Sequence, residues 1–273
     1  MPNPLFLLIL FISSSLPWSD LRGRSLFSLD HPLFSSVTST TAGVPSSPIS
    51  TLADIVLRGY NGWNSRRAVK VLDQVFPKDA AIQPSLVIVY FGGNDAMGPH
   101  SSGLGPHVPL SEYVMNMKKI ATHLQSLSES TRLIFLTCPP VNEEKFGSNT
   151  RNLLSEMVRS NELCKQYSEA CIEMCNEMNL KVVDLFSAIQ GRQDWMNSCL
   201  TDGVHLSEEG NRVIVEEILK VVKEAEWKPS LHWKDMATEF SDDSPYDLVG
   251  FDGKSTVNIS EVRFGYDVKW NSK

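Results

Sequence analysis

The chain has 273 residues, of which 42% are hydrophobic and 21% charged, enough for one sizeable core or two smaller domains. Its net charge is −7, and Lys and Arg never occur in runs longer than two, so the sequence predicts no nucleic-acid-binding surface. No apolar run reaches the roughly 18 residues that a membrane-spanning helix needs.

The N-terminal segment differs in composition from the rest of the chain. An apolar run, Leu5–Ile12, is followed by Ser13–Ser15, which is typical of a secretory signal, although a basic start and a clear cleavage site are missing. From there to Ser50 the chain is rich in Ser, Pro and Thr, a composition typical of flexible segments. We therefore expect residues 1–51 to be an atypical N-terminal segment, signal-like and then disordered.

Strands and helices alternate from residue 52 onward. Apolar runs ended by Gly or Pro predict buried strands at 53–59, 85–93 and 132–140. Apolar residues at helical spacing predict helices over 65–76 and 111–127. The next expected elements are a helix within 152–179, a strand at 181–189 and a helix over 207–226.

This alternation predicts an α/β fold, a flavodoxin-like three-layer sandwich in which helices cover both faces of a parallel sheet. We expect the domain to span residues 52–227. Residues 228–273 are acidic and rich in turn-forming residues, so we expect an irregular C-terminal extension.

The five cysteines give no sign of a metal site. Cys164, Cys171 and Cys175 share one apolar helical stripe, where thiols usually behave as small buried hydrophobic groups. Because no histidine accompanies them at zinc-ligand spacing, we predict no metal and no cofactor. Free thiols favour a cytoplasmic location, whereas the signal-like start favours secretion, so the localisation stays open.

Polar residues follow three of the predicted strands. Gly62 comes after the strand at 53–59, Asn94 after the strand at 85–93, and Asp202 with His205 one short loop beyond 181–189. Because parallel strands end at the same edge of a sheet, we expect these loops to border one pocket.

The residue types in these loops suit acyl transfer. His205 can act as general base and then acid, while Asp202 can orient its ring in hydrogen-bonding range. The backbone N–H of Gly62 and the amide of Asn94 can stabilise an oxyanion, each donor typically contributing about 3 kcal/mol. A simpler interpretation is that Ser207 caps the next helix and that His205 is an ordinary loop histidine.

Four segments resemble the SGNH (GDSL-type) serine esterases, in particular the plant isoamyl-acetate-hydrolysing esterase-like group. They are "RGYNGWNSR" at 58–66, "VYFGGNDA" at 89–96, "GPHVPLSEYVMNMKKI" at 105–120 and "TDGVHLSEEG" at 201–210. The resemblance implies the SGNH hydrolase fold and metal-free hydrolysis of small carboxylic esters, such as acetyl esters. It also implies that Gly62 and Asn94 are oxyanion donors and that Asp202 and His205 belong to a catalytic triad.

The nucleophile motif of that family, Gly-Asp-Ser or Gly-Ser-Ser at the end of a first strand, is missing. Its expected place near residues 30–34 reads "DHPLF", as if the opening strand and helix had been replaced. Ser14 is a weak substitute, because Ile12 stands where the family has a turn glycine and the spacing to Gly62 is longer. We therefore predict that no serine hydroxyl lies within about 4 Å of His205 Nε2.

Two functions stay open at this point. One is an esterase that acts on a small-molecule ester, and the other is a catalytically inactive relative that keeps the pocket and only binds. A nucleotide-binding protein is disfavoured because no glycine-rich phosphate-binding loop is present. The sequence gives no indication of the oligomeric state.

Overall fold

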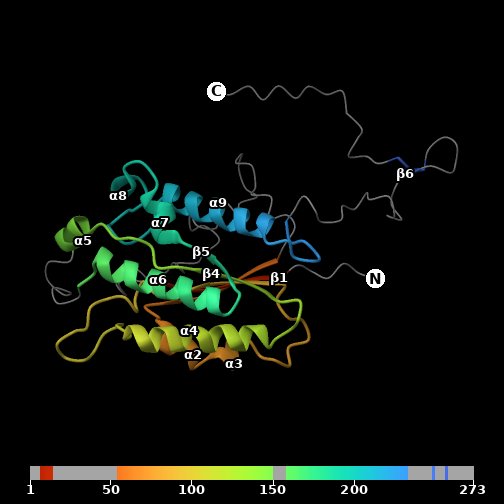
Figure 1. Ribbon diagram of the computed structural model, residues 1–273, viewed down its shortest axis with the longest axis horizontal. Coiled ribbons are helices and arrows are strands. Elements are labelled where there is room, and N and C mark those ends of the chain that lie inside the picture. Colours follow the sequence, from red (N-terminus) through yellow and green to blue (C-terminus); the bar gives the residue numbers. More distant parts are fainter. Residues whose placement is uncertain (1–6, 15–53, 150–157, 233–247, 250–255, 258–273) are drawn as a thin grey trace, which may run out of the picture. The chain divides into compact units, whose positions relative to one another are not determined.

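The computed structural model describes residues 7–14, 54–149, 158–232, 248–249 and 256–257. The chain divides into two units, residues 1–226 and 227–273. In the first unit, α4 with α2 and α3 lies on one side of a five-stranded sheet, and α9 with α7 lies on the other (Figure 1). This is the predicted α/β sandwich, with helices on both faces of a parallel sheet.

The sheet is parallel throughout, in the order β2-β1-β3-β4-β5. Its inner strands are apolar, as expected for strands covered by helices on both faces. In β3, for example, Val87 and Val89 face one helical layer, and the buried Ile88 between them points to the opposite face. The strands are β1 (Leu7–Ser14), β2 (Asp54–Asn61), β3 (Leu86–Tyr90), β4 (Arg132–Leu136) and β5 (Lys181–Val183).

Strand β1 comes from the segment that the sequence analysis described as signal-like. It lies between β2 and β3, with Leu7 opposite Asp54 and Ser14 opposite Asn61. Without it, β2 and β3 would each leave a row of backbone hydrogen-bonding groups unpaired. Residues 7–14 thus occupy the position of the strand that was expected before Gly62, whereas residues 30–34 lie outside the described part of the chain.

The expected helices occur in the predicted order, and two of the expected elements differ in the structure. The helix expected over 65–76 is divided into two short helices, and the strand expected at 181–189 ends at Val183. There Asp184 accepts a hydrogen bond from the Ser187 backbone N–H and caps a helix that buries Leu185 and Ile189. The helices are α2 (Ser65–Val69), α3 (Leu72–Val75), α4 (Leu110–Gln125), α5 (Glu143–Asn149), α6 (Asn161–Glu177), α7 (Leu185–Gln190), α8 (Trp195–Ser198) and α9 (Glu208–Glu224).

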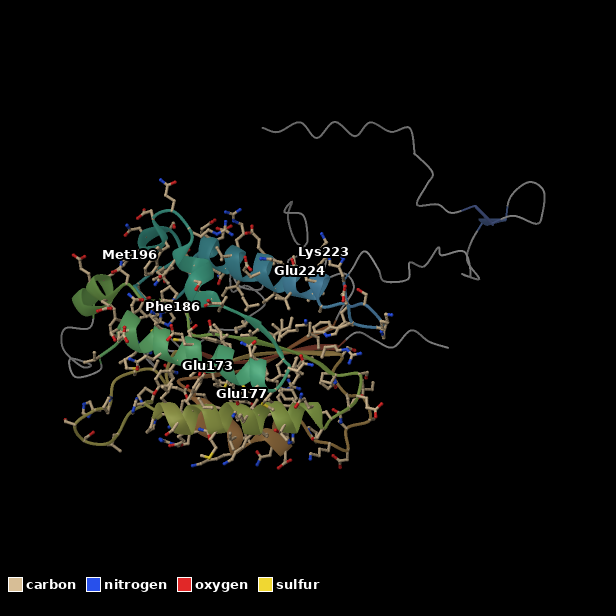
Figure 2. All side chains as sticks on the ribbon, viewed as in Figure 1. Glu173, Glu177, Phe186, Met196, Lys223 and Glu224 are labelled. Atoms are coloured by element: carbon tan, nitrogen blue, oxygen red, sulfur yellow. The ribbon has the colours of Figure 1, made fainter. Side chains whose placement is uncertain are left out.

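Helix α6 illustrates both capping and amphipathic packing. It lies within the range expected for a helix, 152–179, and begins where the Ser160 side chain accepts a hydrogen bond from the Leu163 backbone N–H at 3.2 Å. Its inner face carries the predicted buried thiols and packs with α4 against the sheet. Its outer face carries Glu173 and Glu177 (Figure 2), and Glu177 accepts a hydrogen bond from Lys118 of α4 at 2.5 Å.

The second unit contains a short antiparallel pair that the sequence analysis did not predict. Strand β6 (Leu248–Val249) pairs with β7 (Thr256–Val257). Among the helices in the described ranges, none is long and apolar enough to cross a membrane.

Candidate active site

Three loops at the carboxyl edge of the sheet carry the residues predicted for the site. Gly62 follows β2, and Asn94 follows β3. Asp202 and His205 lie between α8 and the start of α9, in a loop closed by an antiparallel bridge between Leu200 and Leu206. The predicted topology is therefore confirmed for Asn94, which lies at the edge where β3 ends.

Asp202 and His205 form the hydrogen bond that their spacing predicted. His205 Nδ1 lies 2.5 Å from Asp202 Oδ2, and Asp202 Oδ1 accepts the backbone N–H groups of His205 at 2.8 Å and Val204 at 3.0 Å. One carboxylate thus holds both the ring and the backbone of the histidine. When Nδ1 carries the shared proton, Nε2 is the ring nitrogen that can accept a proton.

The electrostatics of this pair favour an ionised acid. Partial burial of Asp202 disfavours its charged form, but the hydrogen bonds and charge of His205 outweigh that effect and hold the pKa of Asp202 well below its usual range. The side chain of His205 is 25% exposed, so it is accessible from solvent. A carboxylate beside an accessible imidazole is the arrangement that stabilises a transient imidazolium.

The loop around this pair is fastened at both ends. The Thr201 backbone N–H donates to the His205 carbonyl at 2.8 Å, and Ser207 caps α9 by accepting from the Gly210 N–H at 3.2 Å. Ser207 therefore caps the helix as the simpler interpretation held, but His205 is also bonded to an acid. Gly203 has a φ of +97°, and its carbonyl accepts from the Asn142 N–H at 2.8 Å, which joins the loop to the start of α5.

Asn94 is 3% exposed and connects the loops after β2 and β3. Its Nδ2 donates to the Trp63 carbonyl at 2.8 Å, so the side chain lies against the residue that follows Gly62. Gly62 itself has a φ of +71°, a conformation that glycine adopts readily. The two predicted oxyanion donors are thus brought to adjacent loops; that they share one pocket with His205 stays a prediction.

Asp95 fastens the same two loops from the inside, a role that the sequence analysis missed. Its Oδ1 accepts the Ser65 backbone N–H at 2.9 Å, and its Oδ2 accepts the Gly92 N–H at 3.2 Å. Burial raises the pKa of Asp95 to about 6, because these hydrogen bonds offset only part of the desolvation cost. Its position in "GGND" beside Asn94 was the one available signal.

Arg159 is the second residue that sequence reasoning missed. It is 8% exposed, and its guanidinium donates to the Gly93 carbonyl and to Asn94 Oδ1 at 3.0 Å. The same group lies over the ring of Phe146 in α5, 5.8 Å from its centroid. Because Arg159 fell within a segment expected to be one long helix, nothing in the local pattern marked it as a site residue.

Ser14 is the last residue of β1 and so lies at the same edge of the sheet. Its backbone is opposite Asn61, the residue before Gly62. The described features of β1 are those of its backbone, so the expected absence of a serine hydroxyl near His205 stays a prediction.

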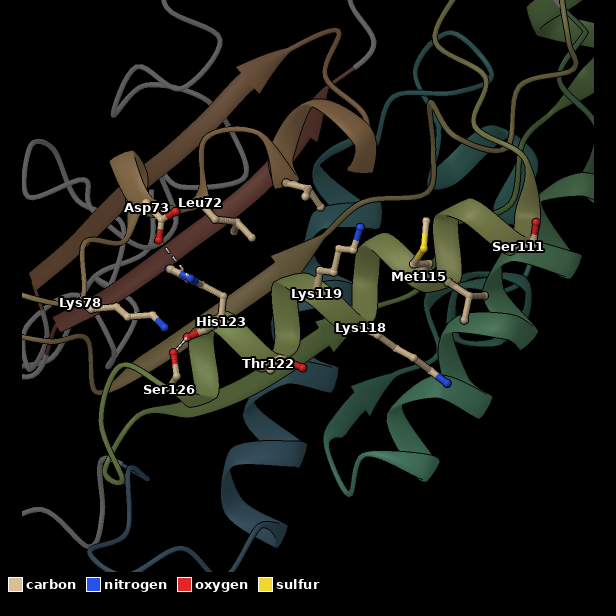
Figure 3. Close-up of a pocket in the computed structure, with 12 residues that line it drawn as sticks. Leu72, Asp73, Lys78, Ser111, Met115, Lys118, Lys119, Thr122, His123 and Ser126 are labelled. Atoms are coloured by element: carbon tan, nitrogen blue, oxygen red, sulfur yellow. Dashed lines mark hydrogen bonds and ion pairs between the residues drawn. The ribbon is translucent and has the colours of Figure 1, made fainter.

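A separate hollow of about 680 Å³ runs along α4, on the side covered by α2 and α3 (Figure 3). It contains none of the predicted site residues. His123 lines this hollow. Its Nε2 lies 2.8 Å from the Phe76 carbonyl oxygen, and its Nδ1 lies 3.6 Å from Asp73 Oδ1, so both contacts join α4 to α3. Over the residues that the structure describes, no group of three or more His, Cys, Asp or Glu side chains could hold a metal ion.

Comparison with known proteins places the chain in a family. The model of the GDSL-like lipase/acylhydrolase family matches residues 40–213. The GDSL esterase/lipase CPRD49 of Arabidopsis thaliana is 66% identical over 219 residues, which cover 80% of this chain and 86% of that relative. The isoamyl acetate-hydrolyzing esterase 1 homolog of Bos taurus is 29% identical over 189 residues, covering 67% of this chain and 76% of that protein.

The fold is also found among solved structures. The lipase/acylhydrolase from Enterococcus faecalis superposes with a TM-score of 0.52 at 16% identity, covering 81% of this chain and 97% of that one. At 16% identity this similarity establishes the fold alone, and the catalytic chemistry has to be argued from the residues at the edge of the sheet.

Proposed function

Because the chain belongs to the GDSL-like lipase/acylhydrolase family, and is an esterase of that type, we propose that it hydrolyses small carboxylic esters of the acetyl type. Asp202 and His205 are its acid–histidine pair, and Gly62 and Asn94 are its oxyanion donors. The observation that carries the proposal is the 2.5 Å contact between His205 Nδ1 and Asp202 Oδ2 at the carboxyl edge of the sheet.

In this mechanism His205 moves protons and Asp202 keeps the ring in place. Nε2 removes the proton of the attacking hydroxyl while that oxygen adds to the ester carbonyl carbon. The imidazolium then protonates the departing alcohol, and a water deprotonated by Nε2 releases the acid from the acyl-enzyme. The low pKa of Asp202 supports this role, since a carboxylate that stays ionised stabilises the imidazolium throughout.

The charge that develops on the carbonyl oxygen is held by donors from two loops. Asn94 Nδ2 is a side-chain donor that faces the loop carrying Gly62, where it bonds the Trp63 carbonyl at 2.8 Å. A second donor from the backbone of Gly62, on the adjacent loop, would complete an oxyanion hole.

We propose Ser14, the weak candidate from the sequence, as the first residue to test as nucleophile; turnover that depends on it would overturn the prediction that no serine hydroxyl lies near His205 Nε2. In parallel α/β sheets ligands bind beyond the carboxyl ends of the strands, and Ser14 ends a strand in the interior of the sheet, opposite the residue before Gly62. Ser13 is a matched control, because successive residues of a strand point to opposite faces.

The experiment is an assay of the purified full chain on p-nitrophenyl acetate, butyrate and octanoate. Turnover of acetate that is lost with Ser14→Ala and His205→Ala but kept with Ser13→Ala supports the proposal. Turnover that survives His205→Ala overturns the assignment of the dyad. A chain that turns over none of these esters and takes no fluorophosphonate label would instead be the binding protein without a nucleophile.

A further inference from the structure

The orientation of the Asn94 amide is fixed by partners on both sides. Arg159 carries only donors, so Nη2 must bond the amide oxygen, 3.0 Å away. The Trp63 carbonyl can only accept, so the amide nitrogen must face it at 2.8 Å. The two contacts select the same orientation, with Oδ1 towards Arg159 and Nδ2 towards the loop that carries Gly62.

The guanidinium also holds the backbone of this loop. Besides Asn94 Oδ1, it donates to the carbonyl of Gly93, so one planar group spans two consecutive residues. A charged donor forms hydrogen bonds roughly twice as strong as a neutral one. A cation on the amide oxygen also draws electron density from the nitrogen, which makes its N–H groups better donors.

Arg159 further connects the two halves of the site. Its guanidinium lies over Phe146, whose backbone N–H donates to the Asn142 carbonyl, and the Asn142 N–H in turn bonds the carbonyl of Gly203. The loop of Asp202 and the loop of Asn94 therefore meet through α5 and Arg159. The positive charge of Arg159 is also close enough to Asp202 to interact with it electrostatically.

We propose that Arg159 is a positioning residue for the oxyanion hole, which locks the Asn94 amide with its nitrogen towards the developing oxyanion and polarises it. This proposal rests on the proposed esterase function. The alternative is that Arg159 only fills and stabilises the interior, in which case its loss would act on the whole fold and not through Asn94.

The first test is a double-mutant cycle in the full chain, with Arg159→Met, Asn94→Ala and the combination assayed on p-nitrophenyl acetate. Arg159→Met keeps an apolar stem of similar length and removes both hydrogen bonds. We expect kcat to fall by about 10- to 100-fold with KM changed less than about twofold, since loss of a whole oxyanion donor costs about 10²–10³ in kcat. In the Asn94→Ala background the same substitution should have almost no further effect.

Two variants make the cycle decisive. Arg192→Met removes a surface arginine that pairs with Glu216 and should leave kcat unchanged. Arg159→Lys keeps the charge without the planar fork and should recover part of the kcat lost in Arg159→Met. Losses that multiply in the double variant, or a fall in kcat that only tracks a lower melting temperature, would overturn the positioning role.

A second test does not depend on turnover. The side-chain amide signal of Asn94, identified by its disappearance in Asn94→Ala, is followed by ¹⁵N–¹H NMR spectroscopy. Arg159→Met should move this signal towards the position of an ordinary surface asparagine, whereas Arg192→Met should leave it in place. An unchanged signal in Arg159→Met would refute the proposal, and a moved signal in a chain without esterase activity would refute only the proposed function.

Discussion

The loops after α8 and after β3 each hold an aspartate, and they hold it in opposite ways. Asp202 takes its partners from its own loop, within three residues, and its pKa is lowered by His205. Asp95 is fully buried, is bonded across 30 residues to Ser65, and has a raised pKa. The first loop presents a charge at the edge of the sheet, whereas the second uses a carboxyl group to fasten two loops from within.

The largest effect on kcat should come from removing the hydrogen bond between Asp202 and His205. Asp202→Asn leaves the ring of His205 without the acceptor that sets its tautomer, and we expect kcat on p-nitrophenyl acetate to fall by about 10⁴-fold. Asp73→Asn is the matched control, because that carboxylate is 89% exposed and lies in the contact with His123 on α4. Equal activity of Asp202→Asn and the wild-type chain would remove the dyad from the mechanism.

Removing the side-chain amide of Asn94 in the second loop should lower kcat by a smaller factor. Asn94→Ala removes one oxyanion donor, and we expect kcat to fall by about 10²–10³, or about 3–4 kcal/mol, with KM nearly unchanged. Asn197→Ala is the control, since that exposed side chain bonds only Asp194 at the start of α8 among the contacts seen here. A loss confined to KM would indicate that Asn94 binds the substrate equally in the ground and transition states.

The two loops also differ in how well the sequence predicted them. The bond between Asp202 and His205 depends on a spacing of three residues and on the helix that begins at Ser207, which are local features. The partners of Asn94 are Trp63 and Arg159, 31 and 65 residues away, and no local pattern specifies such contacts. The strand before Asn94 was predictable from its apolar run, and Asn94 was placed at the correct edge for that reason.

Two apolar runs each fit two interpretations for the same reason. The run at 185–189 is apolar enough for a strand, but Leu185 and Ile189 are also one helical turn apart, and the Asp184 cap decides for the helix. Residues 7–14 have the composition of a signal, and equally of a buried parallel strand. Only the unpaired edges of β2 and β3, which are long-range features, decide where such a run is placed.

A smaller effect should follow from loosening the first loop at its contact with α5. A Cβ atom at Gly203 would lie 2.7 Å from both the Asn142 carbonyl oxygen and the Phe146 nitrogen, and these backbone atoms cannot easily move. We expect Gly203→Ala to lower the free energy of unfolding by about 2–3 kcal/mol, with a loss of esterase activity, because His205 follows two residues later.

Gly103→Ala separates the two causes of the lower unfolding free energy, which are the positive φ of the backbone and the clash of a Cβ atom with α5. Gly103 also has a positive φ, +71°, but a Cβ atom there would meet nothing within 4 Å, so only the backbone cost of about 1 kcal/mol remains. Urea unfolding of both variants measures the difference. Equal destabilisation would mean that the contact between Gly203 and α5 contributes nothing beyond the backbone conformation.

The smallest effect concerns the pH dependence of stability, and here the two aspartates should act in opposite directions. The pKa of Asp95 is about 6 in the folded chain and about 3.9 in an unfolded one, so folding favours its protonated form. Its stabilising contribution is complete below the unfolded pKa and is lost as the pH rises through 6. Asp202, whose folded pKa is lowered, loses its contribution as the pH falls instead.

Asp95→Asn isolates the buried group, because the amide cannot ionise while all other titrating residues are kept. Between pH 5 and pH 7 the free energy of unfolding of the wild-type chain should fall by about 1 kcal/mol relative to the variant. This is the part of the Asp95 contribution that is still present at pH 5 and is lost when the carboxyl group ionises. Urea titrations of both proteins at half-unit steps of pH measure this difference. Parallel curves would show that Asp95 is ionised in the folded chain, and that the carboxyl group fastening the loops after β2 and β3 carries the same charge as Asp202.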